Sequence, residues 1–247
     1  MEGRLIIDDR RDPHHNMAVD QVLLETVAAG APPVLRFYQW DRPTLSLGYF
    51  QTLRDRLTHD ASRGLTVVRR STGGGAIVHD HELTYSLTMP IVDRAAVAVR
   101  RFYDVMHDAI RQALQQFGVH VHRVGEDAKQ VASSPFLCFQ RRTDEDLICA
   151  GYKVLGSAQR RTGHAVLQHG SLLLRASAHA PELPGAFDLG GDPPAVPDLI
   201  QTILQAVDGR RTKVDAWVPS RLERSEQERA GYWSTERFAN RHWLERR

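Results

Sequence analysis

Apolar and polar positions recur along the chain with two different periods, and each period predicts one kind of element. Residues 83–89 alternate apolar and hydroxyl side chains, which predicts a half-buried strand. Between about residues 97 and 117, apolar residues recur at helical spacing and Gly118 follows, which predicts a long helix packed through one face. Another helix is predicted from an N-cap at Asn16 to a stop at Gly30.

Short strand-like runs fill most of the remaining sequence. They cover residues 34–40, 44–49, 65–70, 76–79, 119–124, 147–150, 153–158, 165–168 and 171–175. Residues 125–146 and 176–197 are predicted to be irregular, and short helices are predicted from about 197 to 247. The hairpin-like strand spacing predicts an α/β (α+β) fold with a central, mostly antiparallel mixed sheet flanked by helices. No boundary divides the chain convincingly into two domains.

The composition excludes several classes of protein. The chain has 32 basic and 30 acidic residues and a formal charge of +2, which argues against a nucleic-acid-binding role. No apolar run approaches the ~20 residues that span a bilayer, and the start lacks a secretory signal. Two cysteines exclude a disulfide scaffold, so a reduced, cytoplasmic setting is expected. No Cys/His pairs have metal-ligand spacing, so no metal site is predicted.

Lysine and cysteine usage narrows the candidates for catalysis. Only three of the 32 basic residues are lysines, Lys129, Lys153 and Lys213, and arginine stays protonated in proteins. Cys138 lies in a polar, proline-containing segment, whereas Cys149 lies in an apolar run. A lysine beside a thiol favours the thiolate. Spacing alone does not bring Cys138 to Lys153, so an inert buried cysteine remains the alternative to a catalytic pair.

A glycine-rich loop between two predicted strands is a second candidate. Residues 69–75 read Arg-Arg-Ser-Thr-Gly-Gly-Gly, and consecutive glycines let backbone N–H groups approach the oxygen atoms of a ligand. The segment is not a P-loop, and a plain hairpin turn is the alternative. His79 and His169 stand at predicted strand ends, where they could act as general acids or bases or be structural.

Six short motifs give the sequence a resemblance to a known family. They are, in chain order, Asn16-Met-Ala-Val-Asp20, Arg36-Phe with Pro43-Thr-Leu-Ser-Leu-Gly48, Arg69-Arg-Ser-Thr-Gly-Gly-Gly75, His79-Asp-His-Glu-Leu-Thr-Tyr85, Gly151-Tyr-Lys-Val-Leu-Gly-Ser-Ala-Gln159 and Leu167-Gln-His-Gly-Ser171. Over roughly residues 4–245 the chain resembles the biotin/lipoate protein ligase superfamily, in its lipoate-protein ligase and octanoyltransferase branch. The resemblance implies one catalytic domain over residues 1–247, of the class II aminoacyl-tRNA synthetase and biotin ligase type.

The resemblance also implies a chemistry in lipoic acid assembly. A Cys-Phe pair upstream of a Gly-x-Lys-Val motif is typical of the cysteine/lysine octanoyltransferases, and Cys138 and Lys153 hold those places. In such an enzyme the cysteine takes octanoyl from octanoyl-acyl carrier protein as a thioester, and the lysine handles protons. The acceptor is a lysine of the glycine cleavage H protein or of a 2-oxoacid dehydrogenase E2 lipoyl domain. No cofactor is required, and a monomer without nucleic-acid or membrane partners is expected.

The substrate-binding residues implied by the resemblance lie in the glycine-rich loop and at strand ends. They are Arg70, Thr72, Gly73, Gly74, Gly75, His79, Gly156, Ser157, Ala158, His169 and Gly170. An ATP-dependent lipoate-protein ligase, using ATP and Mg, is one alternative, because Gly73–Ala76 has the ligase form and Tyr152 replaces a common basic residue. A cysteine amidotransferase that moves acyl groups between lipoyl domains is another. A non-catalytic acyl-binding protein is the third.

Overall fold

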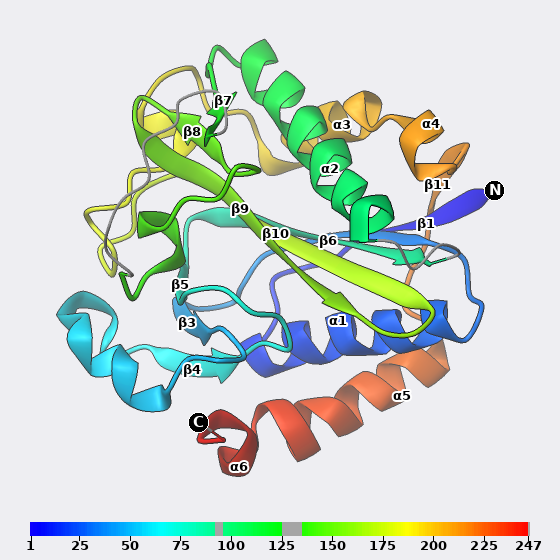
Figure 1. The fold of residues 1–247 in the computed structure, drawn as a ribbon, viewed down its shortest axis with the longest axis horizontal. Helices are drawn as coiled ribbons and strands as arrows, with labels where there is room; N and C mark the ends of the chain where they lie inside the picture. Colours follow the sequence, from blue (N-terminus) through cyan, green and yellow to red (C-terminus); the bar gives the residue numbers. More distant parts are fainter. Residues whose placement is uncertain (92–95, 125–134, 247) are drawn as a thin grey trace.

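One large mixed sheet forms the centre of the molecule. A computed structural model describes residues 1–91, 96–124 and 135–246, without the side chains of residues 96–99. In this part of the chain the large sheet has eight strands in the order β11-β1-β2-β6-β10-β9-β8-β7 (Figure 1). Strands β11, β1 and β2 run parallel, and all other neighbours are antiparallel, so the predicted mixed sheet is confirmed. The strands are β1 (Glu2–Ile7), β2 (Val34–Tyr38), β6 (Glu82–Pro90), β7 (His122–Arg123), β8 (Leu147–Cys149), β9 (Tyr152–Arg161), β10 (Ala165–Leu173) and β11 (Ala216–Pro219).

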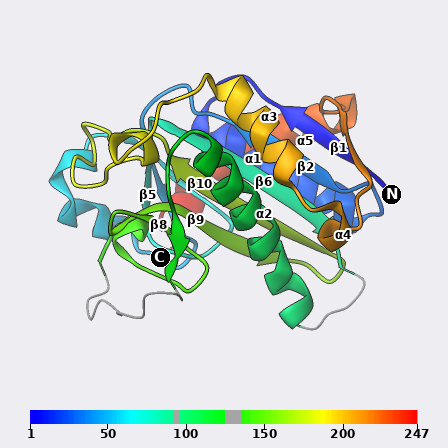
Figure 2. The same cartoon turned by 90° about the horizontal axis from the view of Figure 1, so that it is seen from above.

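Helices cover both faces of this sheet (Figures 1 and 2). Helices α1 and α5 pack on one face, and α2 and α3 pack on the other. Each layer encloses its own apolar core, which includes Met17 and Leu23 of α1 on one side and Phe102 and Ile110 of α2 on the other. The helices are α1 (Pro13–Ala28), α2 (Ala96–Gln116), α3 (Val196–Ala206), α4 (Gly209–Thr212), α5 (Arg224–Trp233) and α6 (Arg241–Leu244).

A small three-stranded sheet stands beside the large one (Figure 1). Its strand β3 (Thr44–Leu47) lies between β4 (Thr66–Arg69) and β5 (Ile77–His79). Residues 70–76, the glycine loop, connect β4 to β5. Ala76 also forms a bridge to Leu137, and this bridge ties the segment before Cys138 to the loop. Short helical turns complete the described chain: η1 (Leu53–Thr58), η2 (Asp60–Ser62), η4 (Cys138–Gln140), η5 (Ala186–Asp188) and η6 (Ser234–Phe238).

The start of α1 differs from the prediction. Asp12, and not Asn16, caps the helix, because its carboxylate accepts the N–H groups of His14 and His15. Pro13 occupies the first helical position, where its missing N–H costs nothing. The end is as predicted, with Gly30 in the left-handed region just after the helix.

Several strands also differ from the predictions. Strand β6 is buried on both faces, because α1 covers the hydroxyl side that was expected to face solvent. The two strands predicted at 165–168 and 171–175 are one strand, β10, which ends at Leu173. The predicted helical end contains a strand, β11, and β1 was not predicted at all. The predicted strand at 119–124 shrinks to β7, and residues 125–134 of the predicted irregular segment lie outside the described residues.

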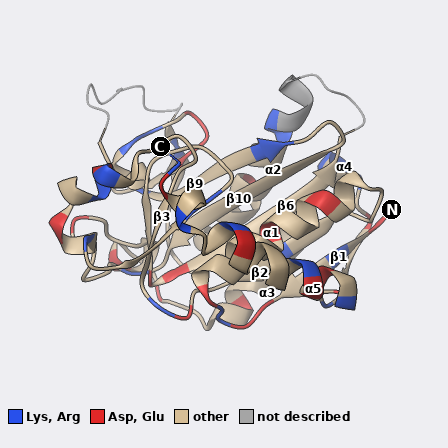
Figure 3. Cartoon of the chain, turned by 90° about the horizontal axis from the view of Figure 1, so that it is seen from below, with Lys and Arg blue, Asp and Glu red and all other residues tan. Residues whose placement is uncertain are grey.

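The surface and the helices agree with the composition. Basic and acidic residues are interspersed along the helices and loops seen in Figure 3, as the near-balanced charge suggests. Within the described residues, no helix combines the length and the apolar character needed to cross a membrane.

Candidate active site

A pocket opens between the large sheet, the small sheet and the start of α1. It has an empty volume of about 440 Å³, its open mouth included. Its lining residues are Met17, Tyr38, Trp40, Arg70, Gly74, Ile77, His79, Thr84, Cys138, Gly156, Ser157, Ala158, His169, Gly170 and Ser171. The predicted site residues outside this lining are Thr72, Gly73, Gly75 and Lys153, and each contacts a residue that belongs to it. The fold therefore brings all the predicted residues to one place.

The register of the large sheet builds the floor of this pocket. Tyr38 pairs with Thr84, Thr84 with Ser171, and Ser171 with Gly156, so these four residues share one face of the sheet. Neighbouring strands lie ~4.8 Å apart, so the row extends for roughly 14 Å. Side-chain size falls from tyrosine at one end to glycine at the other. Such a floor suits an extended chain that lies across the strands and begins beside Gly156.

The fold brings Cys138 to Lys153, which sequence spacing could not do. Cys138 begins η4 and Lys153 lies on β9, with Nζ 3.8 Å from Sγ. The Lys153 ammonium also donates to the carbonyl oxygens of Cys138 and Arg141, each at 3.4 Å. The backbone N–H of Cys138 donates to Ala76 O at 2.7 Å, which fixes the cysteine against the glycine loop. Thiol and amine thus meet at the pocket.

Asp146 is a member of the site that the sequence analysis missed. Its Oδ2 atom lies 2.8 Å from Lys153 Nζ, and both side chains are 3% exposed. Burial raises the pKa of Asp146, and the charge of Lys153 opposes this shift. Gly156 makes room for the pair, because a Cβ there would lie 2.4 Å from Lys153 Cε. The β8–β9 hairpin could have indicated this pairing, since it folds residues near 147 back onto β9.

Arg70 holds the glycine loop from within. Its Nη1 atom donates to Ser46 O and Oγ at 2.9 and 3.0 Å, and its Nη2 atom donates to Gly73 O and Gly75 O at 2.9 and 2.6 Å. Gly74 has a positive φ of 93° that a side chain would strain. A Cβ on Gly75 would lie 2.9 Å from the Cys138 backbone. The glycines therefore let the loop curl round the guanidinium and pack on the cysteine.

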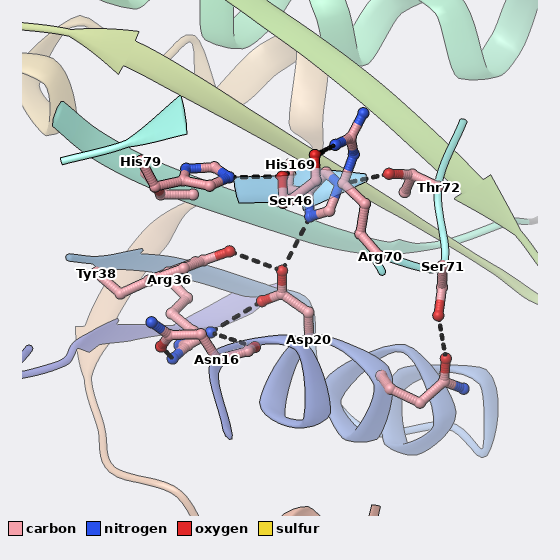
Figure 4. A network of polar contacts seen from close by, with 12 residues as sticks. Asn16, Asp20, Arg36, Tyr38, Ser46, Arg70, Ser71, Thr72, His79 and His169 are labelled. Atoms are coloured by element: carbon pink, nitrogen blue, oxygen red, sulfur yellow. Dashed lines mark hydrogen bonds and ion pairs between the residues drawn. The ribbon is translucent and has the colours of Figure 1, made fainter. Parts of the chain in front are cut away.

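His169 belongs to a buried polar network that reaches the loop (Figure 4). Its ring nitrogens lie 2.6 Å from Thr72 Oγ1 and 3.1 Å from Asp20 Oδ2. Asp20 also accepts from Arg36 Nη1 at 2.9 Å and from Tyr38 OH at 3.0 Å. Burial opposes ionisation of Asp20, but His169 and Arg36 lower its pKa below the usual value. Asp20 lies in the first of the six sequence motifs, but the local pattern indicates no role for it.

His79 belongs to a polar network that reaches Arg70 through Ser46 (Figure 4). Its Nδ1 lies 2.5 Å from Glu82 Oε1, and its Nε2 lies 2.7 Å from Ser46 Oγ. The ring stacks on Trp40 with centroids 3.9 Å apart. Because Arg70 donates to Ser46 Oγ, the serine proton is free to bond His79 Nε2, and His79 Nδ1–H then donates to Glu82. Burial lowers the pKa of His79, so a neutral, structural ring is favoured.

His107 of α2 is a further buried histidine that the sequence analysis missed. Its Nδ1 lies 2.5 Å from Glu145 O, and its Nε2 lies 2.7 Å from Ser157 Oγ. Tyr85 OH also bonds Ser157 Oγ at 2.7 Å. Burial lowers the pKa of His107 to about 4, so the ring is neutral and Nε2 accepts the serine proton. His107 thus ties α2 both to the pocket wall and to the residue before Asp146.

Comparison with known sequences identifies the family. Residues 12–186 match the lipoyl protein ligase A/B catalytic domain. The chain belongs to this family. It is 39% identical over 176 residues to octanoyltransferase LipM of Moorella thermoacetica, a match that covers 69% of this chain and 64% of the relative. It is 38% identical to LipM of Brevibacillus brevis, with 70% and 66% covered. The match thus spans just under two thirds of these relatives.

Solved structures confirm the fold expected of the family. A putative lipoate protein ligase from T. acidophilum, solved with bound lipoic acid, superposes with a TM-score of 0.79 at 20% identity over 100% of both chains. A lipoate-protein ligase A bound with ATP gives 0.78 at 19% identity, over 99% of this chain and 98% of the other. Within the described part of this chain, no group of three or more His, Cys, Asp or Glu residues is arranged to hold a metal ion.

Proposed function

We propose that the protein transfers an octanoyl group from octanoyl-acyl carrier protein to a lysine of a lipoyl carrier domain. The observation that carries this proposal is the position of Cys138 Sγ, at the pocket and 3.8 Å from Lys153 Nζ. The octanoyltransferase names of the relatives support it. The row of small residues from Thr84 to Gly156 supports it too, because an eight-carbon chain fits along such a floor.

The reaction has two acyl-transfer steps. The Cys138 thiolate attacks the thioester carbonyl of the donor, forming a new S–C bond and releasing the carrier thiolate, which takes up a proton. The neutral amine of the acceptor lysine then attacks the acyl-cysteine, forms the amide and releases the Cys138 thiolate. Lys153 passes the proton lost by the amine to solvent, a role typically worth ~10²–10⁴ in rate. Backbone N–H groups of the glycine loop and of residues 156–158 stabilise the oxyanion.

No ATP or metal is needed for this reaction, because the thioester is already activated. The acceptor is the glycine cleavage H protein or the lipoyl domain of a 2-oxoacid dehydrogenase E2. One solved relative is described as a bi-partite lipoate protein ligase studied with its E2 lipoyl domain, which supports a lipoyl domain as the acceptor here.

Intact mass spectrometry after incubation with octanoyl-acyl carrier protein, without ATP, tests the proposal. One octanoyl adduct is expected on the wild-type protein and on Cys149→Ala, and none on Cys138→Ala. Cys149 is the matched control, because it is the second free cysteine and is buried on β8. Adding an apo-lipoyl domain should discharge the adduct onto that domain. Transfer at full rate by Cys138→Ala would refute the thioester mechanism.

An ATP-dependent lipoate ligase is the second candidate. The whole-chain superposition on a ligase with bound lipoic acid favours it. Such an enzyme would lipoylate the same domain from lipoate and ATP, and Cys138→Ala would retain this activity. A cysteine-dependent protein that accepts octanoyl only from an acylated lipoyl domain would instead be an amidotransferase.

A further inference from the structure

The charge of Lys153 is balanced by the carboxylate of Asp146. Its Nζ lies 2.8 Å from Asp146 Oδ2, and both side chains are 3% exposed. Wherever the shared proton resides, the two groups together carry no net charge. The pair therefore does not act on the Cys138 sulfur as a full positive charge.

Arg70 is buried without such a partner. Its hydrogen bonds all go to uncharged oxygens, those of Ser46, Gly73 and Gly75. Among the residues that the structure describes, its buried Nε atom has no hydrogen-bond partner, and no carboxylate forms a salt bridge with it. A buried, unpaired charge destabilises a fold unless an anion comes to it.

Cys138 is the acidic group of the site that lies best placed to face Arg70. A Cβ on Gly74 would lie 3.1 Å from Arg70 Nη2 and 3.9 Å from Cys138 Sγ, so the absent side chain leaves the two groups facing each other. Both also line the same pocket. Burial lowers the pKa of Arg70 to about 10, and the charge of an ionised Cys138 is the strongest interaction that opposes this shift.

The other titratable groups around the thiol bring no comparable charge. Burial raises the pKa of Tyr103, on α2, to about 12, so it is uncharged. His169 bonds Asp20, and Glu82 bonds His79 and is separated from Arg70 by His79 and Ser46. On the cysteine's own segment, the guanidinium of Arg141 donates to Pro135 O and is partly exposed, so solvent screens it.

We propose that Arg70 is the principal charge partner of the Cys138 thiolate, and that Lys153 serves mainly as a local donor and proton carrier. The Cys138 S–H ionises and its proton passes to solvent. The negative charge of the thiolate then balances the positive charge of the buried guanidinium. This role rests on the proposed acyl transfer for its purpose. The charge pairing itself is a property of the free enzyme.

The experiment follows ionisation of the Cys138 thiol through its rate of alkylation. In a Cys149→Ala background, which leaves one thiol, the rate of alkylation by iodoacetamide is followed by intact mass across pH. Arg70→Gln should raise the pH of half-maximal rate by about one to three units, as expected for loss of a nearby opposite charge. Arg70→Lys loses much of the loop geometry but keeps the charge, so it should show less than half of that shift.

Matched variants of the lysine pair complete the test. The double variant Lys153→Met with Asp146→Asn removes both charges and leaves the net charge unchanged, so its shift should be smaller than that of Arg70→Gln. Asp146→Asn alone frees the charge of Lys153 and should move the midpoint to lower pH. The proposal is overturned if folded Arg70→Gln keeps the wild-type midpoint, or if the double variant shifts as far. No acyl donor is present, so a failure of octanoyl transfer would leave this result standing.

Discussion

The burial of His107 predicts that the free energy of unfolding depends on pH. Its ring is fully buried and neutral, with a pKa lowered by burial from 6.5 to about 4. The unfolded chain therefore binds a proton at His107 well before the folded chain does. The stabilisation from the neutral ring is present above pH 6.5, and it is lost as the pH falls towards 4. The difference between the pKa of 6.5 in the unfolded chain and about 4 in the folded chain corresponds to about 3 kcal/mol in the free energy of unfolding.

His107→Asn isolates this contribution. The asparagine amide can still donate to Glu145 O, but Ser157 Oγ loses its acceptor, so the variant should be less stable by about 1–3 kcal/mol at pH 7. Urea unfolding of both proteins at pH 7, 5.5 and 4.5 gives the difference. That difference should shrink towards zero or change sign as the pH falls, because only the wild type has this buried histidine to protonate. A difference that stays constant from pH 7 to 4.5 would show that His107 is not held neutral.

Three further substitutions follow from the packing of the site. Gly156→Ala should slow formation of the octanoyl adduct at least about tenfold, because the new Cβ would lie 2.4 Å from Lys153 Cε and a misplaced catalytic group can cost ~10²-fold in rate. Gly64→Ala is the control, because a Cβ at Gly64 would lie in open space. Equal rates for the two variants would contradict the prediction. Asp20→Asn should lower the free energy of unfolding, measured in urea, by about 3–5 kcal/mol, because it leaves the buried Arg36 with fewer counter-charges. A decrease below about 1 kcal/mol would contradict a stabilising role for this network. Gly170→Ala should lower both the stability of the protein and the rate of acylation, since the new Cβ would lie 2.3 Å from Ser157 Oγ. A melting temperature equal to that of the wild type would contradict this prediction.

Local patterns predicted the elements whose signal is contained in one stretch of sequence. The helix ending before Gly118 and the strand at 83–89 were predicted because their periodicity is strong. Strands β1 and β11 were missed because they come from opposite ends of the chain and pair in parallel, so no hairpin turn marks them. Asn16 was misassigned because it resembles an N-cap, while its amide oxygen in fact accepts from Arg36.

The residues of the site divide in the same way. Local motifs predicted some of them, and contacts between distant elements determine the roles of the others. The pairing of Cys138 with Lys153 came from the family motif, and not from spacing. Asp146 and His107 could not be assigned a role, because a carboxylate in an irregular segment and a polar residue on an amphipathic helix are common in any protein. Their roles depend on contacts between distant elements, which only the folded chain supplies.

The buried polar networks hold the glycine loop in a defined shape. Arg70 binds the loop carbonyls from inside, and Thr72 is held by His169. Ser46 in turn joins Arg70 to His79. Both ring nitrogens of each histidine are already engaged in these bonds, so neither ring is free to accept a proton from substrate without breaking one. In the proposed reaction, proton transfer therefore falls to Lys153, and the histidines fix the loop against which Cys138 packs.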